Sequence, residues 1–270
     1  MIRFVVFHLR SVVATLVAGA LFESITLFSS RMYLPGIFFP LSLKWYLPGT
    51  FLVFTGVIIL LCRRYIRIHM ALWDMALLVM AYVATVLLML LTEWRLVEIT
   101  LEVLGALTIG TLVDILLSNS ETTPVYVKKA FRRIRVMAWV FVVASIMIML
   151  YAMSFFFPNI PLEVLFLFVG SVVAIGSYAI WRMYYQVPLG RFTVWLLIIA
   201  VMSMELFWVI HLLPFGYLVL GFLATWLWYL LLLLIRFHMS AEGIRWKEQR
   251  RFLLTNAGVF ILLLFVIRWI

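Results

Sequence analysis

Nine apolar runs, each about long enough to cross a bilayer, dominate the sequence. A membrane-spanning α-helix needs about 20 mostly apolar residues, because the hydrocarbon core of a bilayer is about 30 Å thick. Hydrophobic residues fill 67% of the 270 positions, and no stretch is both long and polar enough for a separate soluble domain. The sequence therefore predicts an all-α, polytopic transmembrane helix bundle of eight or nine spans, forming one integral membrane domain over residues 1–270. The runs cover residues 11–29, 45–62, 70–91, 96–118, 136–157, 162–181, 192–210, 215–235 and 252–269.

The division between the seventh and eighth runs depends on a short interruption. Only Pro214 and Gly216, with the residues around them, separate two runs that are each near membrane length. A proline ends a helix and a glycine allows a sharp turn, so this pattern favours a tight hairpin over one kinked helix.

Basic residues alternate between the two sides of the predicted bundle. With a cytoplasmic N-terminus and an external C-terminus, 17 of the 21 Lys and Arg residues lie in inner segments. Short cytoplasmic loops carry such an excess, so the pattern predicts this orientation and a multi-pass protein of a plasma (inner) membrane. The net charge of +10 then reflects topology and attraction to anionic headgroups, and we expect no binding to nucleic acid.

Two inner segments are both basic and amphipathic, over residues 123–135 and 240–252. The pattern is typical of helices that lie on anionic headgroups, and a contact with a cytoplasmic partner or a phosphate headgroup is the alternative. Their basic residues are Lys128, Lys129, Arg132, Arg133, Arg135, Arg245, Lys247, Arg250 and Arg251.

The fourth run, Leu96 to Ser118, is unusually polar for its length. Glu98 and Glu102 share one helical face, and Asp114 lies on roughly the opposite face with several hydroxyl residues. A helix that is polar on several sides is unfavourable in contact with lipid chains, so we expect it at the centre of a bundle.

Acidic residues cluster toward the outer side and form the candidate proton or cation site. Its members are Glu23, Glu98, Glu102, Glu205 and His211. Glu23, Glu102 and Glu205 each lie about 10 Å below the outer surface, so we consider whether they converge. Converging carboxylates would suit a proton relay, cation binding or acid catalysis. In the alternative interpretation, these acids pair with Arg31, Arg95 or Arg268, or hydrogen-bond a Thr or Tyr on the next helix.

Two further acids, Asp74 and Asp114, share a depth near the inner face. We expect them to pair with Arg63, Arg64 or Arg67 rather than to form a carboxylate dyad.

No motif in the sequence indicates a cofactor, and His8, His69 and His238 all fall on the inner side, which argues against a histidine metal site. Three functions from different classes stay open. The first is a transport or permease-like component whose outer carboxylates handle a proton or cation. The second is a non-catalytic membrane subunit or scaffold that docks a partner subunit. The third is a membrane enzyme acting on a lipid or lipid-linked substrate.

Overall fold

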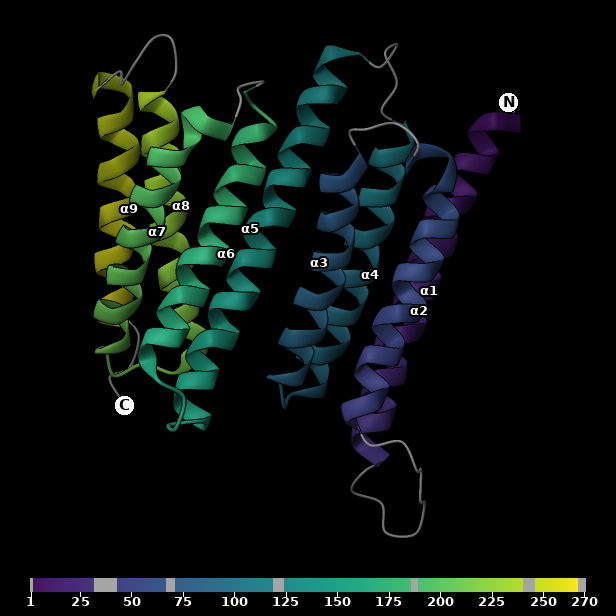
Figure 1. Ribbon diagram of the computed structural model, residues 1–270, viewed down its shortest axis with the longest axis horizontal. Helices are drawn as coiled ribbons and strands as arrows, with labels where there is room; N and C mark the ends of the chain where they lie inside the picture. The colour runs from purple at the N-terminus through teal and green to yellow at the C-terminus, as the bar shows by residue number, and fades with distance from the viewer. Residues whose placement is uncertain are drawn as a thin grey trace. The chain divides into compact units, whose positions relative to one another are not determined.

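The computed structural model describes residues 2–31, 43–66, 71–118, 124–185, 189–239 and 246–266, and these form helices joined by short connections (Figure 1). Eight of the helices in this part of the chain are long and apolar enough to cross a membrane, which confirms the predicted all-α, multi-pass fold. The helices are α1 (Ile2–Arg31), α2 (Leu43–Ile66), α3 (Ala71–Leu90), α4 (Arg95–Ser118), α5 (Val125–Phe156), α6 (Leu162–Arg182), α7 (Leu189–His211), α8 (Tyr217–His238) and α9 (Trp246–Val266).

The predicted hairpin between the seventh and eighth spans is confirmed. Helix α7 ends at His211 and α8 begins at Tyr217. Within the connection, the Phe215 amide donates to the Leu213 carbonyl at 2.8 Å, across Pro214. Pro214 therefore lies where the chain reverses direction. It has no amide hydrogen to donate, so it does not fit the interior of a regular helix.

The helices group into two compact units, Met1–Ile146 and Met147–Ile270, with the change of unit inside α5. In the first unit, α4 packs against both α1 and α3, and α1 also contacts α2. In the second unit, α7 packs against α6 and α8. The grouping describes helix packing, and one integral membrane domain stays a prediction.

Small residues let α1 and α4 approach closely. A Cβ atom added at Gly110 would overlap the side chain of Thr15, and one added at Gly19 would lie 3.7 Å from the Ala106 Cβ. At this close approach the Ser11 hydroxyl donates to the Gly110 carbonyl at 2.6 Å. Such contacts stabilise helix pairs in lipid, where the surrounding chains are as apolar as the helices themselves.

Each unit has its own aromatic core. In the first, the Tyr82 ring stacks between Phe54 and Phe22, with centroid distances of 4.2 and 5.0 Å. In the second, Tyr151 stacks on Phe207 at 4.1 Å, and its hydroxyl donates to the Phe207 carbonyl at 2.9 Å. The buried phenol therefore satisfies its polar end by bonding to the helix on which its ring packs.

Helix α4 is less enclosed than a helix at the centre of a bundle, where the sequence placed it. One face is exposed and includes Leu96, Val103, Leu104 and Leu107. The hydroxyls of this region bond to carbonyls of α4 itself. The donors are Thr100, Thr108 and Thr111, at 2.7, 2.7 and 2.8 Å. A threonine whose hydroxyl donates to a carbonyl of its own helix exposes mainly its methyl group to the surroundings. The threonines of α4 therefore need no hydrogen-bond partner on a neighbouring helix.

The basic segment before the fifth span also differs from expectation. It forms the first turns of α5 rather than a separate interfacial helix, and α5 runs through 32 residues, about 48 Å. No glycine or proline interrupts Val125–Phe156, so nothing in the sequence breaks the helix. In Figure 1 the start of α5 extends beyond the adjacent ends of α3 and α4. Helix α9 likewise starts inside the second basic segment, at Trp246. Arg245 and the side chain of Lys247 lie outside the described residues.

Candidate functional site

Three of the candidate carboxylates meet at one end of the first unit, the end predicted to face outward. Helix α4 supplies Arg95, Glu98 and Glu102 from its first two turns. Their spacing of three and then four residues places all three side chains on one side of the helix. Helix α1 supplies Glu23 and Thr26, which are three residues apart and therefore also share a face.

Arg95 is the centre of this cluster. Its Nη2 contacts both carboxylate oxygens of Glu23, at 3.1 and 3.2 Å. Its Nη1 contacts Glu98 Oε2 at 3.2 Å and Glu102 Oε1 at 3.5 Å. One guanidinium thus serves three carboxylates from two helices, and the group carries a formal charge of −2 when all three acids are ionised.

The cluster becomes more enclosed from Arg95 toward Glu102. Side-chain exposure is 46% for Arg95 and 43% for Glu23, but 17% for Glu98 and 9% for Glu102. Glu102 has a second partner, because the Thr26 hydroxyl lies 2.7 Å from its Oε1. The most enclosed acid is therefore held from both sides, by a guanidinium and by a hydroxyl.

The Thr26 hydroxyl can serve Glu102 in either protonation state. It has one proton and two neighbours, Glu102 Oε1 at 2.7 Å and the Phe22 carbonyl at 3.4 Å. When Glu102 is ionised, Thr26 donates to it. When Glu102 carries a proton, the acid donates to Thr26, which in turn donates to Phe22.

Glu23 and Glu102 make the contacts that the alternative interpretation names, with Arg95 and with a threonine on the next helix, and a shared functional site stays a prediction. Glu205 and His211 belong to the second unit, so their convergence with these acids stays a prediction. No sequence pattern singles out Thr26 or the central position of Arg95 among the acids. The spacing of Arg95, Glu98 and Glu102 was the available signal.

Glu205 and His211 have different surroundings within the second unit. Glu205 is exposed on α7. His211 faces α5, with its ring 6.3 Å from Tyr151 and 6.0 Å from Phe155. Six residues turn the helix by about 240°, so the two side chains leave α7 in different directions.

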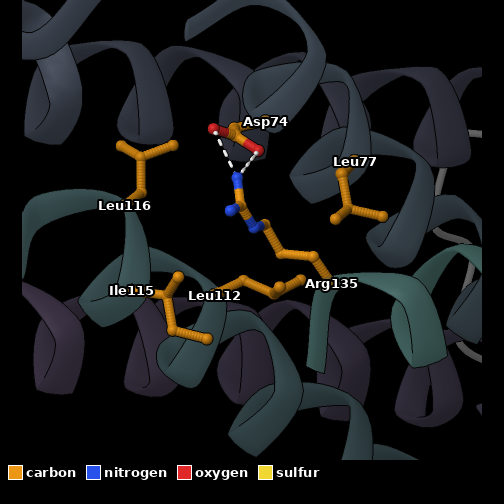
Figure 2. Close-up of a pocket in the computed structure, with 6 residues that line it drawn as sticks. All are labelled: Asp74, Leu77, Leu112, Ile115, Leu116 and Arg135. Carbon is orange, nitrogen blue, oxygen red and sulfur yellow. Dashed lines mark hydrogen bonds and ion pairs between the residues drawn. The ribbon is translucent and has the colours of Figure 1, made fainter. Parts of the chain in front are cut away.

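A second charged site lies toward the predicted inner end of the first unit, where Asp74 of α3 pairs with Arg135 of α5 (Figure 2). Arg135 Nη1 lies 3.0 and 3.3 Å from the two Asp74 oxygens. The pair borders a small pocket, and Figure 2 shows aliphatic side chains around it, from Leu77, Leu112, Ile115 and Leu116.

This pairing corrects one expectation about the inner face. Asp74 pairs with Arg135, a residue predicted to contact lipid or a partner. Arg67 and the side chains of Arg63 and Arg64 lie outside the described residues, so the pairings predicted with them stay predictions. Asp114 is half-buried and interacts with a neighbouring group. Lys129 and Arg133 are exposed, and their predicted contact with lipid stays a prediction, whereas Arg135 lines the pocket beside Asp74.

Across the part of the chain that the structure describes, no group of three or more His, Cys, Asp or Glu side chains is arranged to hold a metal ion. Comparison of the chain with protein-family models, with curated proteins and with solved structures finds no match.

Proposed function

We propose that the protein is a transport or permease-like membrane component that binds a proton at the Arg95 cluster. The observation that carries the proposal is the arrangement of Glu102, enclosed, bonded to Thr26 and sharing Arg95 with two other carboxylates. An intramembrane carboxylate is costly to keep, so its presence favours a functional role.

The charge balance supports a proton rather than a larger cation. Three carboxylates surround one guanidinium, which already occupies the central position that a metal ion would need. A proton needs no such space. Its uptake lowers the repulsion among the three acids, and the Thr26 hydroxyl satisfies Glu102 both before and after uptake.

The rest of the α1–α4 interface favours a carrier over an open pore. Inward from Glu102 the two helices meet through apolar and small side chains. Phe22 and Ala18 are fully buried, and Gly19 lies against Ala106. The next hydroxyls inward on α1, those of Thr15 and Ser11, bond to backbone carbonyls. A bound proton would therefore cross only if these helices rearrange around the site, as carriers do.

Proton flux through purified protein in liposomes tests the proposal. We expect the wild-type protein to dissipate a pH gradient, followed with an enclosed pH-sensitive dye, and Glu102→Gln to slow this flux about tenfold or more. Glutamine keeps the volume and the bond to Thr26 but cannot bind a proton. Glu163→Gln is the matched control, because Glu163 is exposed in the first turn of α6.

Infrared difference spectra between acid and neutral pH provide a direct measure of proton binding. We expect a protonated-carboxyl band in the wild type and in Glu163→Gln, and its loss in Glu102→Gln. The proposal fails if wild-type flux equals that of empty liposomes, or if a monodisperse Glu102→Gln protein retains full flux.

A further inference from the structure

Glu205 lies on an exposed and otherwise apolar face of α7. Exposed side chains recur every three to four residues along this face, and the opposite face is buried through Ser203, Phe207 and Ile210. The exposed residues are Val194, Leu197, Val201, Trp208 and Leu212. Glu205 continues the same series between Val201 and Trp208 and is itself exposed. The face thus combines an apolar surface with one ionisable group.

This carboxylate lies within the spanning part of α7. It precedes the end of the helix at His211 by six residues, about 9 Å, and Trp208 lies nearly one turn beyond it, toward that end. Tryptophan is enriched at the membrane–water interface, which places Glu205 below that level. A charge in the hydrocarbon region costs free energy unless another group pairs with it.

Other carboxylates within the described helices are paired or lie where a negative charge is favoured. Arg95 serves three of them, Asp74 pairs with Arg135, and Asp114 interacts with a neighbouring group. Glu163 lies in the first turn of α6, where the helix dipole favours a negative charge. Glu205 has no hydrogen bond or ion pair with any described residue.

We infer that this α7 face binds a membrane-spanning helix of another protein, with a lysine or arginine of that helix at the depth of Glu205. The apolar side chains around Glu205 provide the packing surface, and the carboxylate sets the register and selects a cationic partner. A symmetric dimer through this face would place two Glu205 carboxylates together, so a second copy lacks the required charge.

Photo-crosslinking in the membranes of the source organism tests this inference. A photoreactive residue replaces Met202 or Val209, which flank Glu205 and are 43% and 53% exposed. The control position is Leu254, 61% exposed on α9. We expect Met202 and Val209 adducts, absent at Leu254, whose mass spectra identify a spanning segment that contains Lys or Arg.

The decisive measurement is how the yield of crosslinked protein depends on the charge at position 205. We expect Glu205→Gln to lower the crosslinked fraction about tenfold, the size expected for a lost charged contact in a membrane interface. Glu205→Lys should abolish crosslinking, and exchanging the partner's basic residue for Glu should restore it. Size-exclusion profiles of both variants should match the wild type, because the exposed Glu205 side chain makes no bond with any residue that the structure describes.

Four results would each overturn the inference. They are adducts with lipid alone, adducts only with another part of the same chain or with a second copy, a captured helix that lacks a basic residue, and an unchanged yield in Glu205→Gln. Proton flux by the purified protein is a separate measurement, so this outcome is independent of the function proposed for the Arg95 cluster.

Discussion

At the scale of single residues, the outer cluster depends on two side chains that are not acids. Arg95 holds the three carboxylates together, and Thr26 fixes the most enclosed of them from the other helix. Both residues act as hydrogen-bond donors. A substitution that removes the donor but keeps the shape of the side chain therefore isolates the contribution of the hydrogen bond to stability.

Thr26→Val keeps the shape of the side chain but removes the donor to Glu102. We expect it to lower the free energy of unfolding by about 1–2 kcal/mol, the range for hydrogen bonds between membrane helices. Thr26→Ser keeps the hydroxyl and should lose less. Thermal unfolding in detergent micelles compares the two, and equal losses would show that packing rather than the bond holds Glu102.

Arg135→Leu leaves the Asp74 carboxylate beside Leu77 and Leu112 without its partner. We expect a loss of about 1–3 kcal/mol in the free energy of unfolding, because removing one member of a partly buried pair leaves the other uncompensated.

Adding Asp74→Leu to the Arg135→Leu chain should recover most of that stability, since an apolar pair then replaces the charged one. Arg133→Leu, an exposed change two residues away, is the control for altered helix charge. A double variant no more stable than Arg135→Leu would contradict the assignment of the loss to an unpaired Asp74.

At the scale of helices, association depends on positions where one backbone meets another. Gly221 of α8 is the closest case in the second unit, since a Cβ added there would lie 2.6 Å from Ile148 Cα and 2.7 Å from its amide nitrogen. Backbone atoms cannot turn aside as a flexible side chain can, so α8 and α5 must separate to admit even one methyl group.

Gly221→Ala should therefore destabilise the protein by about 1–3 kcal/mol, the usual cost of overpacking. Gly258→Ala is the matched control, because the space around Gly258 in α9 is open. Alanine favours helix over glycine, so we expect the control to leave stability unchanged or slightly higher. Thermal unfolding of the two variants should move in opposite directions, and a shared direction would contradict the packing argument.

At the scale of the whole molecule, the sequence predicts the helices far better than it predicts their neighbours. Span length is set locally by bilayer thickness, so the run predicted at 162–181 matches α6 at Leu162–Arg182. Contacts such as Thr26 with Glu102 join residues 76 positions apart, and no periodicity encodes that choice. Arg135 was assigned to lipid for the same reason, because its basic neighbours predict a surface whereas only the fold shows Asp74 beside it.

Orientation in the membrane is the whole-molecule property that remains a prediction. A cysteine at the exposed Asn159, between α5 and α6, should react with an impermeant maleimide on intact cells. A cysteine at the exposed Lys129 should react only after the membrane is opened. Cys62 is buried, so the native chain should give little background. Labelling of Lys129→Cys on intact cells would reverse the predicted topology.

The short spacing between Arg95 and Glu98 also affects how the chain is inserted into the membrane during synthesis. A nascent segment meets the insertion machinery before its later neighbours exist, and an unpaired charge raises the free energy of its insertion. Arg95 and Glu98, three residues apart, can neutralise each other as soon as α4 forms. Glu102 lies farther from Arg95, at 3.5 Å, and its shorter contact, at 2.7 Å, is with Thr26, a residue synthesised 76 positions earlier. Helix α1 is thus already in the membrane when α4 enters the bilayer. The two helices can then associate in the order in which they are synthesised.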